Sequence, residues 1–149
     1  MEKEEIIIIN KSDNQDPDYE TLGSAGFDLR SNEEVIILPK EIVLVGTGLH
    51  FQLPLYLEIQ VRPRSGLALK HSITVLNSPG TIDSDYQGEV KVILINHGDR
   101  QFKIEKGDRI AQAVMGMVFG KQEITFKTVE GFDNITERGT GGFGSTGVK

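Results

Sequence analysis

The segment 77–88, NSPGTIDSDYQG, carries side chains that could read a planar base and activate a water molecule. Asp83 or Asp85 could take a proton from an attacking water, which is the task of a general base. The free backbone groups of a hairpin in this segment could pair with the edge of a base. On spacing alone, a polar β-hairpin with aspartates at its turn positions explains the same residues.

Arg64 and Ser65 lie side by side in RPRSGL (62–67), where a predicted strand ends at a proline and a glycine. An arginine beside a hydroxyl could clamp a phosphate group, although surface arginines near turns are ordinary. AGFDLR (25–30) and KGDRIAQ (106–112) are two further polar segments, which we interpret as turns. None of the three segments establishes a site by itself.

The C-terminal segment RGTGGFGSTGVK (138–149) contains five glycines. Such a segment has high backbone entropy and little to bury, so we expect it to be mobile when nothing holds it. Its glycines let backbone N–H groups converge on an anion, and Arg138, Ser145 and Thr146 add side-chain donors. Phe143 could stack on a planar ring. The alternative is a disordered, Gly-rich terminus.

Composition excludes several kinds of site. The chain has no cysteine, which rules out disulfides and thiolate metal ligands, and its three histidines show no ligand spacing. No Ser-His-Asp set can be assigned from the residue order. The net charge of −6 disfavours an extended nucleic-acid surface, while a few clustered arginines could still bind a small anion. No stretch predicts a signal peptide or a membrane span, so we expect a soluble, cytoplasmic protein.

Short apolar runs with a period of two predict the β-strands that position these segments. In LYLEIQV (55–61) alternate residues are apolar, which is typical of a half-buried strand. Similar runs lie at 6–9, 35–38, 42–45, 73–76, 90–95 and 124–126. The segment 109–119 fits either a helix or a buried strand, and we favour the strand. A short helical turn is expected around 67–70.

Many short strands separated by turn residues indicate an all-β sandwich, jelly roll or barrel. The length of 149 residues suits one compact domain. We therefore divide the chain into one domain at 1–137 and a mobile arm at 138–149.

Taken together and in order, five segments of the chain resemble the five motifs of the trimeric dUTP pyrophosphatases (dUTPases). They are AGFDLRS (25–31), RPRSGLA (62–68), NSPGTIDSDYQGE (77–89), KGDRIAQ (106–112) and RGTGGFGSTG (138–147). Each motif is weak alone, but five in register along nearly the whole chain are a specific resemblance.

The resemblance implies a jelly-roll-like β-barrel that forms a homotrimer, with active sites between subunits and the C-terminal arm of one chain closing over a site built by the others. The implied reaction is hydrolysis of dUTP to dUMP and pyrophosphate, which limits uracil incorporation into DNA and supplies dUMP for thymidylate synthesis. Mg²⁺ would be held by the triphosphate and water, with no protein ligand. Nucleic acid and membranes are not expected partners.

By the same resemblance, Asp83 is the general base for the water that attacks the α-phosphorus. Tyr86 packs beneath the deoxyribose and leaves no space for a ribose 2′-hydroxyl, and Phe143 stacks over the uracil. The uracil edge pairs with Asn77 and with the backbone around Gly80, Thr81, Ile82 and Asp83. The phosphates contact Arg64, Ser65, Gly66, Gln112 and, from the arm, Arg138.

Four further residues complete the implied site. Gly144, Ser145 and Thr146 of the arm contact the substrate, as does Lys91. Asp28 is expected to lie behind the residues that touch it.

Three other functions compete with this interpretation. A dCTP deaminase shares the fold but places a catalytic glutamate inside the strand that follows the third motif. Here VKVILI (90–95) contains no acid, and Glu89 lies too close to the preceding glycine. A regulatory nucleotide-binding protein is disfavoured by the intact Asp83 and arm. A plain β-sandwich interaction module would make the arm and the segment 77–89 coincidences.

Overall fold

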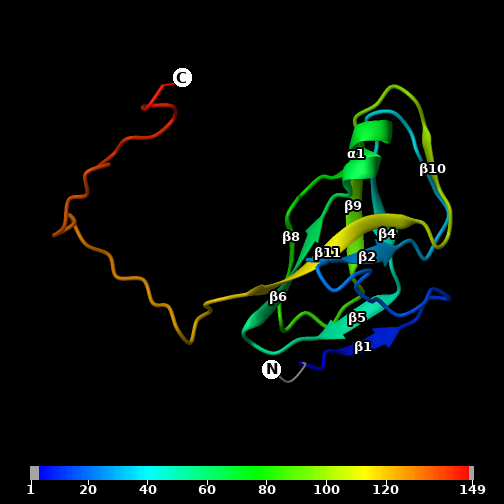
Figure 1. The fold of residues 1–149 in the computed structure, drawn as a ribbon, viewed down its shortest axis with the longest axis horizontal. Helices are drawn as coiled ribbons and strands as arrows, with labels where there is room; N and C mark the ends of the chain where they lie inside the picture. Colours follow the sequence, from blue (N-terminus) through cyan, green and yellow to red (C-terminus); the bar gives the residue numbers. More distant parts are fainter. Residues whose placement is uncertain (1–3, 148–149) are drawn as a thin grey trace.

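The computed structural model describes residues 4–147, and this part of the chain forms eleven β-strands and one short helix (Figure 1). In chain order the elements are β1 (Ile7–Asn10), β2 (Phe27–Arg30), β3 (Val35–Ile37), β4 (Ile42–Gly46), β5 (Leu49–Gln52), β6 (Leu57–Arg62), α1 (Ser65–His71), β7 (Ile73–Val75), β8 (Gly80–Ile82), β9 (Lys91–Asn96), β10 (Phe102–Ile104) and β11 (Arg109–Met117). No helix among these elements is long and apolar enough to cross a membrane.

The strands pair in antiparallel fashion and form four small sheets. The largest has the order β2-β11-β6-β8, the next has the order β4-β9-β7, and the pairs β1-β5 and β10-β3 complete the set. Neighbours within a sheet are distant in sequence, so the chain crosses repeatedly between sheets, as in jelly-roll folds. Figure 1 shows the sheets wrapped around one interior, with α1 at one end. The predicted all-β class is confirmed.

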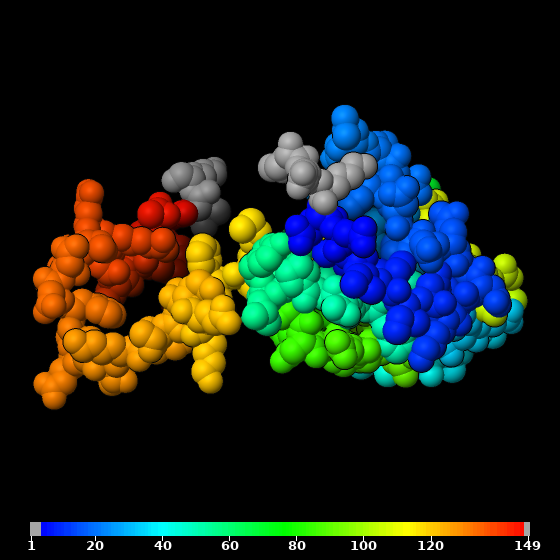
Figure 2. Space-filling view, turned by 90° about the horizontal axis from the view of Figure 1, so that it is seen from below, coloured from blue at the N-terminus to red at the C-terminus, as the bar shows by residue number. Residues whose placement is uncertain are grey.

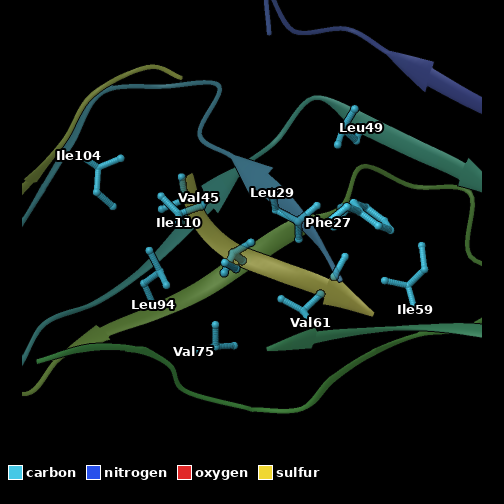
Figure 3. Close-up of a cluster of buried hydrophobic side chains, with 14 of the residues drawn as sticks. Phe27, Leu29, Val45, Leu49, Ile59, Val61, Val75, Leu94, Ile104 and Ile110 are labelled. Atoms are coloured by element: carbon cyan, nitrogen blue, oxygen red, sulfur yellow. The ribbon is translucent and has the colours of Figure 1, made fainter. Parts of the chain in front are cut away.

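The interior is filled by the inward side of each strand. In β9, Val92 and Leu94 are completely buried while Lys91 is exposed, which is the period-two pattern of a strand with one side in the core. Figure 3 shows apolar side chains from all four sheets meeting in this cluster. Each fully buried side chain of leucine size contributes about 1.5–3 kcal/mol. The strand pairs are too short to be stable alone, and burial of their apolar side chains in one core stabilises them.

One buried polar side chain joins three segments at the end of β9. The Asn96 amide donates to the carbonyl oxygens of Ile37, at 3.0 Å, and of Arg100, at 2.7 Å. Its own oxygen accepts from the backbone N–H of Gly98 at 2.9 Å. Because this side chain is fully buried, its hydrogen bonds fix the β9–β10 loop against β3.

The sheet β4-β9-β7 is apolar on both faces. On the face turned away from the core, Ile42 and Leu44 of β4 are more than half exposed, at 54% and 59%. They are paired in register with Ile95 and Ile93 of β9, which lie on the same face. Leu76, just after β7, adds a further exposed apolar side chain. An exposed apolar surface of this kind is typical of protein–protein contacts.

After β11 the chain leaves the body. Residues 118–147 form turns and extended backbone but no strand, and Figures 1 and 2 show this stretch running away from the sheets. The strand predicted at 124–126 is therefore wrong. Its β-branched and aromatic residues favour a strand only where a neighbouring strand supplies hydrogen bonds, and Phe126 is 97% exposed. The division of the chain at residue 138 stays a prediction.

Two local predictions are confirmed. The segment 109–119 forms the strand β11 rather than a helix. The helical turn expected around 67–70 is the centre of α1.

Two others are wrong. AGFDLR and KGDRIAQ are not turns throughout, since β2 begins at Phe27 and β11 at Arg109. The segment 77–89 is not a hairpin either, because β8 pairs with β6 whereas β7 belongs to a different sheet. The strand β2 resembles a turn in the sequence because its polar residues alternate with Phe27 and Leu29, which are buried.

Candidate functional site

A cluster of charged side chains lies where β6 ends and α1 begins. Arg64 directly precedes the helix in an extended conformation (φ −94°, ψ 129°). Its Nε lies 3.1 Å from Oδ1 of Asp28, a β2 residue whose side chain is only 18% exposed. The second carboxylate oxygen of Asp28 lies 3.3 Å from Nη1 of Arg109 on β11. One carboxylate thus orients two guanidinium groups.

Gln112 connects this cluster to the sheet. It faces Asp28 of β2 and Arg62 of β6 in the strand register, and its side-chain amide donates to the carbonyl oxygen of Pro63 at 3.0 Å. Asp28, Arg64, Arg109 and Gln112 are called the arginine cluster below. Ser65 and Gly66, at the start of α1, are exposed beside Arg64. Two oriented guanidiniums next to a hydroxyl are a suitable arrangement for phosphate oxygens.

A second group of predicted site residues surrounds β8. Asn77 lies just before this strand, and its side chain covers Gly80 so closely that a Cβ there would lie 3.2 Å from the amide nitrogen. The same Cβ would lie 3.3 Å from Cβ of Val61 on β6. Only glycine therefore fits without displacement between the amide and the sheet, which keeps the amide close to the backbone of β8.

Asp83 and Tyr86 follow β8 and face an open groove of about 300 Å³. The groove is lined by Leu44, Thr81, Ile82, Asp83, Tyr86, Glu89, Lys91 and Ile93, and we call it the tyrosine groove. The Tyr86 backbone N–H donates to the carbonyl of Asp83 at 3.1 Å, and its hydroxyl donates to the carbonyl of Glu89 at 2.9 Å. Lys91 lies 3.5 Å from the Glu89 carboxylate. The groove also borders the exposed apolar surface of β4-β9-β7.

The arginine cluster and the tyrosine groove lie at opposite ends of one strand pair. Val61 of β6 faces Gly80 of β8, and the two strands run in opposite directions from this point. Arg64 lies three residues beyond Val61, and Asp83 lies three residues beyond Gly80 the other way. Six residue steps of extended chain correspond to roughly 20 Å. The backbone positions of Arg64 and Asp83 within a single chain therefore lie far apart.

The predicted residues of the arm lie apart from both groups. Arg138 donates to the carbonyl of Gly141 at 3.0 Å within the arm itself. Phe143 is fully exposed and has a positive φ of 50°. Figure 1 shows this part of the chain far from the body.

Two residues of the site were not assigned from sequence. Arg109 shares the Asp28 carboxylate with Arg64. The available signal was that Arg109 lies within one of the five motifs, KGDRIAQ (106–112). Glu89 was judged only as a misplaced deaminase acid, whereas its side chain accepts a hydrogen bond from the Gly48 N–H at 3.0 Å. Among residues 4–147, no three metal-ligating side chains come together as a cation site.

The fold and these groups define an all-β protein that carries two separate polar half-sites, one suited to phosphates and one suited to a ring and a water molecule. A family model described as dUTPase matches residues 12–147. The deoxyuridine 5′-triphosphate nucleotidohydrolase of Nautilia profundicola is 57% identical over 88% of this chain and 89% of its own length. The corresponding protein of Clostridium acetobutylicum is 58% identical over 85% of each chain.

Among solved structures, the dUTPase of Staphylococcus bacteriophage 80alpha with bound dUpNHpp superposes with a TM-score of 0.89. It is 26% identical, and the match covers 98% of this chain and 100% of that one. The chain belongs to the dUTPase family.

Proposed function

We propose that this protein hydrolyses dUTP to dUMP and pyrophosphate. The observation that carries the proposal is the tyrosine groove, where a carboxylate and a tyrosine from one turn face the same open space. The family match and the names of the curated relatives support the same reaction. Removal of dUTP would limit uracil incorporation into DNA, and the dUMP formed would supply thymidylate synthesis.

Asp83 is the proposed general base. It lies at the end of β8, lines the groove and has no ion-pair partner among the described residues, so its oxygens are available to an attacking water. Removing such a base commonly costs 10²–10⁴-fold in rate. The phosphates would lie against Arg64, Ser65, Gly66 and Gln112, because hydrolysis at phosphorus depends on positioning and charge neutralisation.

Base and sugar selectivity follow from the other end of the nucleotide. Asn77 and the backbone of Gly80–Ile82 would pair with the uracil edge, and cytosine would reverse the donor and acceptor pattern there. A site built on such hydrogen bonds rejects the wrong pattern by about 10⁴-fold or more. Tyr86 would pack against the deoxyribose and exclude a 2′-hydroxyl, while Lys91 would contact the substrate from β9.

A homotrimer is the proposed assembly. The separation of roughly 20 Å between Arg64 and Asp83 exceeds a triphosphate, whose phosphorus atoms are joined through single oxygens. An assembly that takes the two groups from different chains would bring them together on one nucleotide. The exposed apolar surface of β4-β9-β7 supports this contact, because it adjoins the tyrosine groove through Leu44 and Ile93.

The arm would complete the site. Residues 138–149 would close over a nucleotide bound elsewhere in the assembly, with Phe143 stacked on the uracil and Arg138, Gly144, Ser145 and Thr146 near the phosphates. The path of residues 118–147 away from their own body supports this role (Figure 2). A segment that is ordered only by ligand acts as a lid that excludes water.

Mg²⁺ is the proposed cofactor. Because the described residues offer no cluster of ligands, the ion would be bound by triphosphate oxygens and water, and it would neutralise charge on the phosphates. A cytoplasmic location is proposed with it, since the implied substrate belongs to the nucleotide pool.

The decisive experiment measures pyrophosphate release from dUTP, dCTP, dTTP and UTP with Mg²⁺, for the wild type beside Asp83→Asn. We expect rapid release from dUTP alone and a loss of at least about 10²-fold in the variant. An unchanged rate in Asp83→Asn would contradict the role of this carboxylate. Ammonia released from dCTP would point to a deaminase, and dUTP binding without turnover to a regulatory protein.

A further inference from the structure

The position of Tyr86 is set by contacts within its own turn. Its hydroxyl donates to the Glu89 carbonyl at 2.9 Å. Between them, a Cβ on Gly88 would lie 2.5 Å from the hydroxyl oxygen and 2.6 Å from the ring carbon that bears it. The phenol therefore fills the place that a side chain at Gly88 would take, and its direction depends on where the Glu89 carbonyl points.

Glu89 is itself anchored to a different part of the fold. Its Oε1 accepts a hydrogen bond from the Gly48 N–H, at 3.0 Å, in the connection between β4 and β5. The next residue, Val90, donates its N–H to the Leu49 carbonyl at 2.8 Å. The Thr47 hydroxyl donates to the Val90 carbonyl at 2.6 Å, and Nδ1 of His50 lies 2.9 Å from the Gln87 carbonyl. The side chain of Glu89 is thus one of several contacts that tie the turn to this part of the fold, and it reaches the connection between β4 and β5 from the residue whose carbonyl Tyr86 binds.

We propose that Glu89 is a positioning residue for sugar selectivity, which acts by holding Tyr86 where a ribose 2′-hydroxyl would lie. The inference rests on the proposed placement of Tyr86 against the deoxyribose. Rejecting one hydroxyl requires the ring to stay within a fraction of an ångström, because a small displacement opens room for the oxygen. Loss of the side-chain anchor leaves the Val90 backbone hydrogen bonds in place but gives residues 86–89 more freedom to move, and UTP is then accepted more readily.

The chain supplies a matched control at the end of β4. Glu33 accepts a hydrogen bond at 2.8 Å from the N–H of Gly46, the last residue of β4, and it makes no hydrogen bond with the described residues of the turn that carries Tyr86. Removing either carboxylate takes one comparable hydrogen bond from the end of β4 or from the connection that follows it. Only Glu89 is hydrogen-bonded to the Tyr86 hydroxyl. We therefore expect both variants to lower stability, but only Glu89→Ala to change sugar selectivity.

A second route from Glu89 leads to Lys91, through the carboxylate oxygen 3.5 Å from Nζ. Glu89→Gln distinguishes the routes. Its amide oxygen can still accept from Gly48, while the negative charge opposite Lys91 is gone. Retention of selectivity in Glu89→Gln therefore assigns the effect to the anchor.

The experiment compares kcat/KM for dUTP and UTP in the wild type, Glu89→Ala, Glu89→Gln and Glu33→Ala. We expect the ratio of UTP to dUTP efficiency to rise about tenfold in Glu89→Ala, the size typical of losing one hydrogen bond to a charged group. Glu89→Gln and Glu33→Ala should keep the wild-type ratio. In a Tyr86→Phe background, Glu89→Ala should add no further change, because both act through the same hydroxyl.

An unchanged ratio in Glu89→Ala would overturn the inference, as would an equal rise in Glu33→Ala. Both results leave dUTP hydrolysis by the wild type untouched. Failure of the wild type to discriminate UTP at all would instead overturn the proposed placement of Tyr86.

Discussion

Mixing two inactive variants should restore activity if each site draws on two chains. Asp83→Asn disables the tyrosine groove of its chain but leaves the arginine cluster intact, and Arg64→Ala does the reverse. Within one chain the two residues lie six residue steps apart along β6 and β8, roughly 20 Å. Neither variant alone can then assemble a complete site in a homotrimer.

The expected recovery follows from counting neighbours. In trimers formed at random from equal amounts of the two variants, a site is intact when the groove comes from an Arg64→Ala chain and the cluster from an Asp83→Asn chain. Each condition holds for half of the chains, so about a quarter of the sites should work in a cyclic assembly. Pyrophosphate release from dUTP should accordingly rise to about a quarter of the wild-type rate.

The assay requires proof that the chains have mixed. The variants are combined in denaturant, refolded together, and checked by native mass spectrometry with one variant carrying a mass tag. A mixture that contains hybrid trimers but shows no more activity than its two parents would refute the argument, because the site would then lie within one chain.

Four further outcomes can be measured. Deleting residues 138–149 should abolish turnover while leaving the melting temperature of the body unchanged, since the hydrogen bonds of the described part of this segment stay within the arm and its neighbour Thr136. Parallel melting curves and pyrophosphate assays check both. Gly80→Ala should raise KM for dUTP by about tenfold, because the added methyl group would lie 3.2 Å from the amide expected to read uracil. Asn96→Ala should lower the free energy of unfolding by about 2–4 kcal/mol, measured in urea, because one buried and two partly buried backbone groups lose their partner. Finally, the hydrogen bond from Lys106 holds the pKa of Asp13 below its ordinary value. The stability from this contact is therefore complete at pH values above the ordinary pKa and is lost as the pH falls through the lowered pKa. Asp13→Asn should have a slightly lower melting temperature than the wild type at pH 7, and the difference should vanish in acid.

Strands with one buried side could be predicted from the sequence because their apolar residues alternate. The strand β6 follows this rule, and β11 was correctly favoured over a helix. The strand β2 was not predicted, because it is only four residues long and its polar residues Asp28 and Arg30 make the segment resemble a turn. Its strand character depends on pairing with β11, which is about eighty residues away.

The site was predictable as a set of residue types but not as an arrangement. Five motifs in order identified the family, yet nothing in their spacing shows that Arg64 and Asp83 lie at opposite ends of one strand pair. That separation follows from the β6–β8 register, a tertiary property. The sequence likewise could not show that Glu89 reaches the β4–β5 connection, because the partners are 41 positions apart in the chain.

The two ends of the β6–β8 pair also constrain how copies of this chain can assemble. A groove on one chain must meet a cluster on the next, so the contact joins two different surfaces and repeats head to tail. Such contacts either close into a ring or continue as a filament. A two-fold dimer could pair each groove with the other chain's cluster only if groove and cluster both belonged to one self-complementary surface. The proposed activity thus selects for the rotation between neighbours: an angle that closes after three chains completes every site, and an open chain of copies always leaves one groove and one cluster unused at its ends.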